Sequence, residues 1–157
     1  MVIFINGSIN AGKTTVADIL VKKIPNTAHV DIDMLRFFIT WMPLDESIPI
    51  NLENAALVIK NFVEKGLNVV VTYPISQKNY EFLMEKLKDL KDKIYFFTLN
   101  PQMQTILNRG VMSDAERERV RYHYKIEINK PTFGVIIDST GKTPEQTAQE
   151  MLKLLRK

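Results

Sequence analysis

The 157-residue sequence contains no cysteine and only two histidines. These absences exclude a disulfide framework, a thiol nucleophile and a cysteine-based metal centre, and they leave little for a zinc site. Any bound metal is therefore expected to be a hard ion held by oxygen ligands. A long apolar run is also missing, because the opening segment Val2–Ile5 is short and continues into a glycine-containing motif. We expect a cytoplasmic protein that does not enter a membrane.

A large excess of charge of one sign is absent as well. The 21 Lys and Arg residues face 18 Asp and Glu residues, which gives a net charge of +3, and basic side chains are mostly interleaved with acidic ones, as at positions 116–119. Duplex nucleic acid is therefore not an expected partner. The length is that of one domain, so we expect a single domain over residues 1–157, as a monomer or a homodimer.

Short apolar segments with strand character alternate with segments of helical periodicity. This alternation predicts an α/β fold in which a parallel sheet is flanked by helices. Gly66 is expected to follow the end of one helix, and Asn100-Pro101 to begin another. Two capping boxes, Ser113 with Glu116 and Thr143 with Gln146, predict helices near 114–127 and 144–156. The predicted strands are Val2–Ile5, Ala28–Ile32, Leu67–Thr72, Ile94–Leu99 and Val135–Ile137.

The first predicted strand leads into the segment GSINAGKTT, which matches the pattern G-x-x-x-x-G-K-[ST]. In a strand–loop–helix context this pattern predicts a P-loop, whose backbone N–H groups and helix N-terminus hold phosphate. Lys13 is expected to reach the β- and γ-phosphates of ATP, and Thr14 to supply a hydroxyl to Mg²⁺. The residues expected to contact the nucleotide are Gly7, Asn10, Ala11, Gly12, Lys13, Thr14 and Thr15.

Two carboxylates, Asp31 and Asp33, lie at the end of the second predicted strand. Because side chains alternate along a strand, both are expected on one face, at the carboxyl end of the sheet where ligands bind. One can orient Mg²⁺ through water while the other accepts the proton of an attacking hydroxyl. Alternatively, Asp33 only caps a helix that begins near Met34.

Other classes of P-loop protein are disfavoured. The nearest match to a guanine-reading motif, at residues 129–132, lacks the aspartate and precedes a strand. The apolar strand at 67–72 ends in threonine, whereas motor and transporter ATPases usually carry an acid there. The two aspartates after the second strand therefore point to a different kind of phosphoryl chemistry.

Together these features resemble the small P-loop kinases typified by shikimate kinase, gluconate kinase and chloramphenicol phosphotransferase, and in particular the tunicamycin-resistance-like proteins. The resemblance covers nearly the full length and implies a three-layer α/β/α fold with a five-stranded parallel sheet in the order 2-3-1-4-5. It also implies that Asp31 lies near Mg²⁺ and that Asp33 is the general base. It rests on Asn6-Gly7-Ser8 with the P-loop, Val30–Leu35, the helix Ser113–Tyr124 and the segment Gly134–Glu145.

The resemblance further implies two roles for arginines. Arg109, which follows the predicted helix at 101–108, matches an arginine that packs against adenine. Arg117, Arg119 and Arg121 match arginines of a lid, here about 109–121, that stabilise charge on the transferred phosphoryl group; we place Arg119 with Lys13 among the catalytic residues. The alternative is a solvated helix face, because acidic residues alternate with these arginines.

The acceptor pocket is expected within residues 34–65. Leu35, Phe38, Ile39 and Met42 form a predicted core-facing stripe, and Phe37 and Trp41 add a second apolar edge. With Asp33, Arg36 and Tyr73, these two aromatic residues are expected to bind an acceptor that has an apolar or ring portion and a hydroxyl. The aromatic patch can equally be core alone, and Arg36 can equally pair with a neighbouring acid.

We therefore expect an ATP- and Mg²⁺-dependent phosphotransferase that acts on the hydroxyl of a small molecule, either a metabolite or an antibiotic-like compound. A nucleoside monophosphate kinase is an alternative, although Arg36 is the sole arginine between the second and third predicted strands. An alternative of another class is a nucleotide-binding resistance or regulatory protein that sequesters its ligand.

Overall fold

A parallel five-stranded sheet forms the centre of the computed structural model, which describes residues 1–156. Neighbouring strands follow the order β2-β3-β1-β4-β5, and each adjacent pair is parallel. Both the α/β class and this strand order confirm the prediction. The strands are β1 (Val2–Asn6), β2 (Thr27–Asp31), β3 (Asn68–Thr72), β4 (Ile94–Leu99) and β5 (Val135–Ile137).

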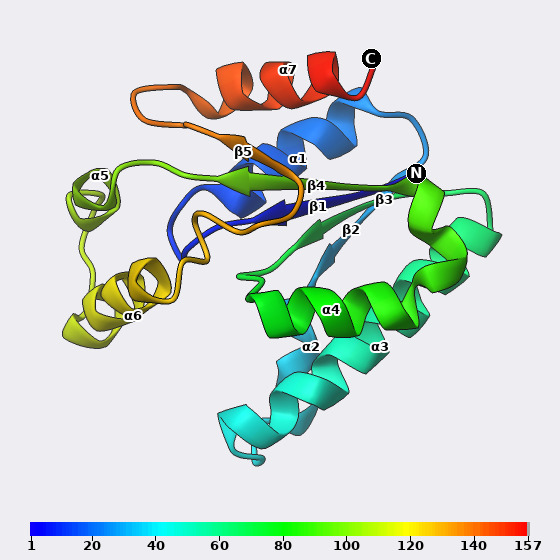
Figure 1. The fold of residues 1–157 in the computed structure, drawn as a ribbon, viewed down its shortest axis with the longest axis horizontal. Helices are drawn as coiled ribbons and strands as arrows, with labels where there is room; N and C mark the ends of the chain where they lie inside the picture. Colours follow the sequence, from blue (N-terminus) through cyan, green and yellow to red (C-terminus); the bar gives the residue numbers. More distant parts are fainter. Residues whose placement is uncertain (157) are drawn as a thin grey trace.

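Helices cover both faces of the sheet (Figure 1). Helices α1 (Lys13–Lys23) and α7 (Pro144–Leu154) pack together on one face, and α3 (Leu44–Glu64) and α4 (Gln77–Lys86) pack together on the other. Helices α5 (Met103–Leu107) and α6 (Asp114–Lys125) lie beyond the carboxyl ends of the strands. No helix formed by residues 1–156 has the length and apolar character needed to cross a membrane.

Two apolar cores lie on the two faces of the sheet. Successive residues of β1 show the division, because Phe4 belongs to the core under α3 and α4, whereas Ile3 and Ile5 belong to the core under α1 and α7. All three side chains are fully buried. This is the pattern of a parallel strand covered on both sides, and it explains why β1 is a continuous apolar run. The carboxyl end of β1 is thereby held between the two layers.

Three predicted helix boundaries are confirmed. Both capping boxes are present at the starts of α6 and α7. Helix α3 ends before Gly66, whose N–H donates to the carbonyl of Val63 at 3.0 Å, and the next N–H, of Leu67, donates to Phe62 at 3.0 Å. This pair of bonds satisfies carbonyls at the helix end.

The prediction that Asn100-Pro101 begins a helix is wrong. The N–H of Asn100 donates to the carbonyl of Ile137 at 2.9 Å, so this residue still bonds to the neighbouring strand. The N–H of Gln102 then donates to Oγ1 of Thr140 at 3.0 Å, and α5 begins only at Met103. Tertiary hydrogen bonds therefore hold the segment extended for two residues longer than the local sequence indicates.

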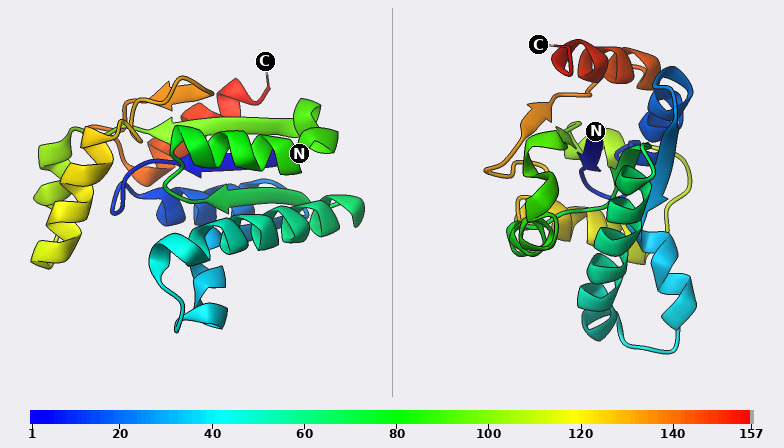
Figure 2. Two further views of the ribbon diagram at one scale, coloured as in Figure 1. Left: turned by 60° about the horizontal axis from the view of Figure 1, so that its bottom comes forward. Right: turned by 90° about the vertical axis from the view of Figure 1, so that its right-hand side faces the viewer.

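The segment after β2 also differs from the prediction. A short helix, α2 (Ile32–Leu35), begins at Ile32 instead of near Met34, and a 3₁₀ turn, η1 (Arg36–Ile39), follows it. Phe38 is 82% exposed, so the predicted core-facing stripe is wrong at this residue. The 3₁₀ turn rotates successive side chains by about a third of a turn each, and α2 with the start of α3 projects away from α7 (Figure 2).

A second 3₁₀ segment lies later in the chain. This segment, η2 (Lys88–Lys93), follows α4 and leads into β4. It contributes no buried side chain and lies at the amino end of β4, away from the functional side chains described below.

Candidate active site

The P-loop, residues 7–14, follows β1 and curls back toward its end. Gly7 has φ +141°, and a Cβ added there would lie 2.8 Å from the backbone oxygen of Leu99 on β4. A side chain at this position would therefore collide with the neighbouring strand. Gly12 has φ +96° and precedes α1, whose first intrahelical bond joins Val16 N–H to the Gly12 carbonyl at 3.0 Å. The N–H groups just before Val16 have no acceptor within the helix, which is the arrangement that holds phosphate.

Lys13 lies at the start of α1, with its ammonium folded onto the loop. Its Nζ donates to the carbonyl of Ser8 at 2.8 Å. Burial lowers the pKa of Lys13 to about 8, while the carboxylates of Asp33 and Asp31 act in the opposite direction. A bound phosphate would supply a negative charge next to this desolvated ammonium, so the P-loop fits a nucleoside triphosphate.

The two aspartates after β2 have different roles in the local structure. Asp31 is the N-cap of α2, and its Oδ1 accepts the N–H of Asp33 at 3.0 Å. The capping role that the sequence allowed for Asp33 therefore belongs to Asp31. Asp33 lies in the first helical turn instead of on the strand, and its carboxyl group is left without a structural hydrogen bond within residues 1–156.

Asp33 is placed to accept a proton. Burial, which removes water from the carboxyl group, raises its pKa, and the charge of Asp31 adds to this effect. Lys13, Arg119 and Arg36 oppose the rise, which places all three cations around the same carboxylate. A carboxylate with a raised pKa is a stronger base than an ordinary aspartate, which suits a group that accepts a proton.

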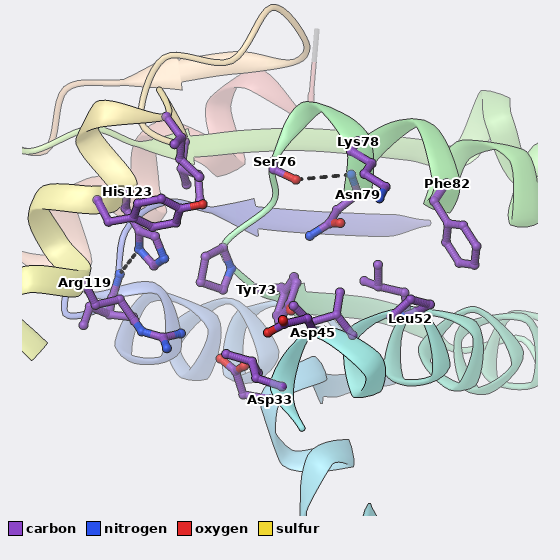
Figure 3. A pocket seen from close by; sticks show the side chains of 18 of the residues that line it. Asp33, Asp45, Leu52, Tyr73, Ser76, Lys78, Asn79, Phe82, Arg119 and His123 are labelled. Atoms are coloured by element: carbon purple, nitrogen blue, oxygen red, sulfur yellow. Dashed lines mark hydrogen bonds between the residues drawn. The ribbon is translucent and has the colours of Figure 1, made fainter. Parts of the chain in front are cut away.

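A cavity of about 850 Å³ opens directly beside Asp33. Asp33 and Arg119 lie at one end, and Leu52 and Phe82 lie at the other, between α3 and α4 (Figure 3). The lining is largely apolar. The residues are Ile9, Asp33, Leu44, Asp45, Ile48, Pro49, Leu52, Tyr73, Pro74, Ser76, Lys78, Asn79, Phe82, Ala115, Glu118, Arg119, Tyr122, His123, Ile126 and Ile128.

Of the three candidate lid arginines, Arg119 lines this cavity. Arg117 instead donates from Nη1 to the carbonyl of Leu107 at 3.1 Å, and Arg121 pairs with Glu118 one turn earlier. Arg109 is separate from all three, because its Nη1 donates to the carbonyl of Asn10 in the P-loop at 3.2 Å. Arg109, which follows α5, thus contacts the P-loop, and Arg119 lines the cavity from α6.

The predicted acceptor residues are divided by the structure. Tyr73 is buried and lines the cavity, and burial with the nearby charge of Asp33 raises its pKa to about 12, so its hydroxyl remains a donor at neutral pH. Arg36 does not line the cavity. Its Nη1 donates to Oγ of Ser47 at 3.2 Å, and its charge acts on Asp33. Phe37 and Trp41 do not line the cavity, and they are 71% and 78% exposed.

Several cavity residues were not predicted from the sequence. Lys78, Asn79 and Phe82 line it from α4, and they share one helical face through spacings of three and four residues. His123 lines it from α6 and lies four residues after Arg119. The same spacing rule would have grouped His123 with Arg119 once α6 was known to face the site.

Oxygen ligands for a metal are available next to the P-loop lysine. No group of three or more His, Asp or Glu side chains that could hold a metal occurs among residues 1–156. In phosphoryl-transfer sites, however, Mg²⁺ commonly takes one or two protein oxygens and completes its shell with phosphate and water. The hydroxyl of Thr14 and the carboxylate of Asp31 fit that donor set. The charge of Asp31 acts to raise the pKa of Lys13, so the two groups lie near each other.

Comparison with known proteins identifies the fold. No protein-family model matches the chain, and no curated protein matches it either. Solved structures do match. The tunicamycin resistance protein of Deinococcus radiodurans has a TM-score of 0.68 and 21% identity over 98% of this chain and 94% of that one. A sugar kinase from Janibacter sp. HTCC2649 has a TM-score of 0.74 and 17% identity over 99% of this chain and 94% of that one.

Thymidylate kinase from Candida albicans matches as well, with a TM-score of 0.61 and 13% identity over 99% of this chain and 90% of that one. The chain therefore has the fold of the small P-loop kinases, as its sequence predicts. Kinases of sugars and kinases of nucleotides share this fold, so the acceptor has to be argued from the cavity.

Proposed function

We propose that this protein is a kinase that transfers the γ-phosphate of ATP to a hydroxyl group of a small molecule with a sizeable apolar portion. The observation that carries the proposal is the position of Asp33, which lies between the P-loop lysine and a cavity of about 850 Å³. The cavity and the cradle meet at this carboxylate. An acceptor hydroxyl held there would face the end of a nucleotide bound in the P-loop.

The residues divide the reaction between them. Asp33 accepts the proton of the acceptor hydroxyl as its oxygen forms a bond to the γ-phosphorus, and the bond to the β–γ bridging oxygen breaks, with the electron pair leaving on ADP. Lys13 and Arg119 flank Asp33 and stabilise the negative charge on the transferred group. Arg109, bonded to the P-loop at Asn10, is the candidate for the adenine side.

Mg²⁺ would be held by Thr14 and Asp31, and when bound it would neutralise charge on the nucleotide phosphates. Asp31 is already fixed as the N-cap of α2, so its free carboxylate oxygen is held in one orientation. This leaves Asp33 as the group available for the acceptor.

The lining of the cavity supports an acceptor that is mainly apolar. Beyond Asp33 and Arg119, α3 and α4 line the cavity with the apolar side chains Leu44, Ile48, Pro49, Leu52 and Phe82, together with Asp45, Asn79 and a single cation at Lys78. A nucleoside monophosphate acceptor needs several cations around its phosphate, because each phosphate oxygen must be paired when it leaves water. One lysine does not meet that need, so the small-molecule acceptor is favoured over the nucleotide.

A ligand-sequestering protein of this fold remains the alternative of another class. It would need the cradle and the cavity, but it would have no use for a base with a raised pKa beside Lys13. The position of Asp33 therefore favours the enzyme.

Release of ADP tests the proposal. The purified protein would be given ATP, Mg²⁺ and a panel of compounds that share an apolar ring or chain and differ in carrying a hydroxyl, a methoxy group or a phosphate. We expect hydroxyl compounds to stimulate ADP release and to appear as phosphate esters by mass spectrometry. Tight binding of these compounds without stimulation would favour sequestration, and stimulation by nucleoside monophosphates alone would favour a nucleotide kinase.

A further inference from the structure

His123 joins α6 to the P-loop through a buried contact. Its side chain is buried, and Nδ1 lies 3.3 Å from the backbone nitrogen of Ile9 and 3.2 Å from Oγ of Ser8. Ser8 and Ile9 are the second and third residues of the P-loop, and the carbonyl of the same Ser8 accepts Lys13. One imidazole therefore contacts the loop that carries the phosphate-binding lysine.

The hydrogen-bond pattern fixes the state of the ring. The N–H of Ile9 can only donate, so Nδ1 of His123 must carry a lone pair and the ring proton must be on Nε2. Protonation of Nδ1 would remove the acceptor and place a second N–H against that of Ile9. Burial, together with the charges of Lys13 and Arg119, lowers the pKa of His123 to about 4. The neutral ring is thus the form present at neutral pH.

Other bonds already hold α6 to the body of the protein. Arg117 donates to the carbonyl of Leu107 at 3.1 Å, and the hydroxyl of Tyr124 donates to the carbonyl of Pro101. Beyond the helix, the carbonyl of Ile128 accepts Nδ2 of the buried Asn6 at 2.9 Å. None of these bonds reaches residues 7–14, so the contact of His123 is not needed merely to keep α6 in place.

His123 also lies on the same helix as a proposed catalytic residue. Arg119 lies four residues earlier on α6, and the two side chains line the same end of the cavity (Figure 3). Residues separated by four are neighbours on one helical face. Any rotation or shift of α6 relative to the P-loop would therefore move Arg119 relative to Lys13 and Asp33.

We propose that His123 is a positioning residue that fixes the distance between the P-loop and Arg119 by accepting the N–H of Ile9. It acts through Arg119 and the loop, without contacting the reacting atoms. This inference rests on the proposed kinase function for its kinetic consequences, whereas the contact itself can be tested without any acceptor.

Two substitutions of similar size test the hydrogen-bond acceptor of His123 separately from the volume of its side chain. His123→Asn keeps an acceptor oxygen close to the position of Nδ1 and cannot be protonated, whereas His123→Leu keeps apolar volume and removes the acceptor. We expect His123→Leu to lower kcat by about 10- to 100-fold, the range seen when a catalytic group is displaced by about 1 Å. His123→Asn should recover kcat to within about 3-fold of the original protein, and Kd for ATP should change by less than about 3-fold in both.

The second half of the experiment asks whether the effect passes through Arg119. In protein that already carries Arg119→Ala, adding His123→Leu should lower kcat by less than about 3-fold, because the displaced group is no longer there. Full additivity of the two losses would overturn the positioning role. His29→Asn, which changes the other histidine of the chain, serves as the control and should leave kcat and the pH profile unchanged.

Amide hydrogen exchange at Ile9, followed by NMR in the ATP-free protein, reads the contact directly. We expect exchange to be at least about 10-fold faster in His123→Leu than in His123→Asn. Equal rates would overturn the proposal whether or not the protein is a kinase, whereas faster exchange with no phosphate transfer by the unmodified protein would overturn the proposed function alone. If His123→Leu does not fold, His123→Gln, whose oxygen lies near the position of Nε2, replaces it in each comparison.

Discussion

The two ends of the cavity are built on different principles. At the Asp33 end, charged groups are held in place by hydrogen bonds to the backbone, as Lys13 is to Ser8 and Asp31 is to the N–H of Asp33. At the Phe82 end, apolar side chains of α3 and α4 form the walls with few polar groups. In the proposed function, the first end would transfer phosphate to the acceptor hydroxyl. The second end would select the acceptor, because burial of apolar surface there favours binding of molecules with an apolar portion.

Burial of charged groups at the Asp33 end carries a free-energy cost. Burial lowers the pKa of Lys13 to about 8 and raises that of Asp33, so both groups are held in surroundings that disfavour their charged forms. Opposite charges nearby offset part of this cost. Such opposed shifts are typical of sites where function outweighs stability. The comparison therefore predicts different responses to substitution at the two ends.

The largest effect is expected at Lys13. Lys13→Ala removes the cation that the P-loop directs at the phosphates, so transfer should fall by about 10³-fold or more and ATP affinity should fall with it. Initial rates and calorimetric titration with ATP measure the two quantities. Lys22→Ala, at an exposed position of the same helix, is the matched control and should change neither. Retention of ATP affinity in Lys13→Ala would mean that the nucleotide binds elsewhere.

A smaller loss is expected at Arg119. Arg119→Ala should lower kcat by about 10²-fold while Kd for ATP changes little, because its charge acts on Asp33 and Arg119 makes no hydrogen bond to residues 7–14. Arg119→Lys should recover part of the loss, since a point charge replaces a fork of donors. The control is Arg117→Ala, whose side chain bonds to the carbonyl of Leu107 and should affect kcat by less than about 3-fold. Equal losses in the two alanine variants would refute the selection of Arg119.

At the apolar end, the effect should appear in binding. Phe82→Ala removes part of the cavity wall and should raise KM for the acceptor by about 10-fold with kcat nearly unchanged. Trp41→Ala removes a larger side chain that is 78% exposed and outside the cavity lining, and it should change KM by less than about 2-fold. Steady-state kinetics with the best acceptor measures both. The opposite order would show that the acceptor lies against Phe37 and Trp41, as the sequence alone suggests.

The smallest effect is one of stability. The folded pKa of Asp33 is raised, so ionisation of this carboxyl group favours the unfolded chain, and stability is lost as pH rises from about 3.8 through the folded pKa. Asp33→Asn cannot ionise and should be more stable than the original protein at pH 7, with the difference shrinking toward pH 4. Thermal unfolding at both pH values measures this difference. A lower Tm for Asp33→Asn at pH 7 would show that its carboxylate stabilises the fold.

The shape of the P-loop could be predicted from the sequence because it depends on local backbone geometry. Gly7, Gly12 and Lys13 act within one loop whose shape follows from the residues themselves, and the alternation of strands and helices predicted the sheet. The sequence analysis already placed Arg119 among the catalytic residues. The orientation of α6 adds a physical reason, because Arg119 lines the cavity whereas Arg117 and Arg121 bond elsewhere.

The acceptor side could not be predicted in the same way. Its walls come from α3, α4 and α6, which are far apart in the sequence and meet only in the folded chain. The composition suggested a pocket at Phe37 and Trp41, yet both side chains are exposed in and just after the 3₁₀ turn η1. The different fates of Asp31 and Asp33 depend on a helix that begins at Ile32, a boundary that local preference placed two residues later.

The most direct test of the account is the rate of phosphate transfer by Asp33→Asn, measured together with ATP binding on the same preparation. If Asp33 accepts the proton of the acceptor hydroxyl, transfer should fall by about 10²- to 10⁴-fold while Kd for ATP stays within about 3-fold of that of the original protein. An Asp33→Asn protein that transfers phosphate at the original rate would contradict the central claim.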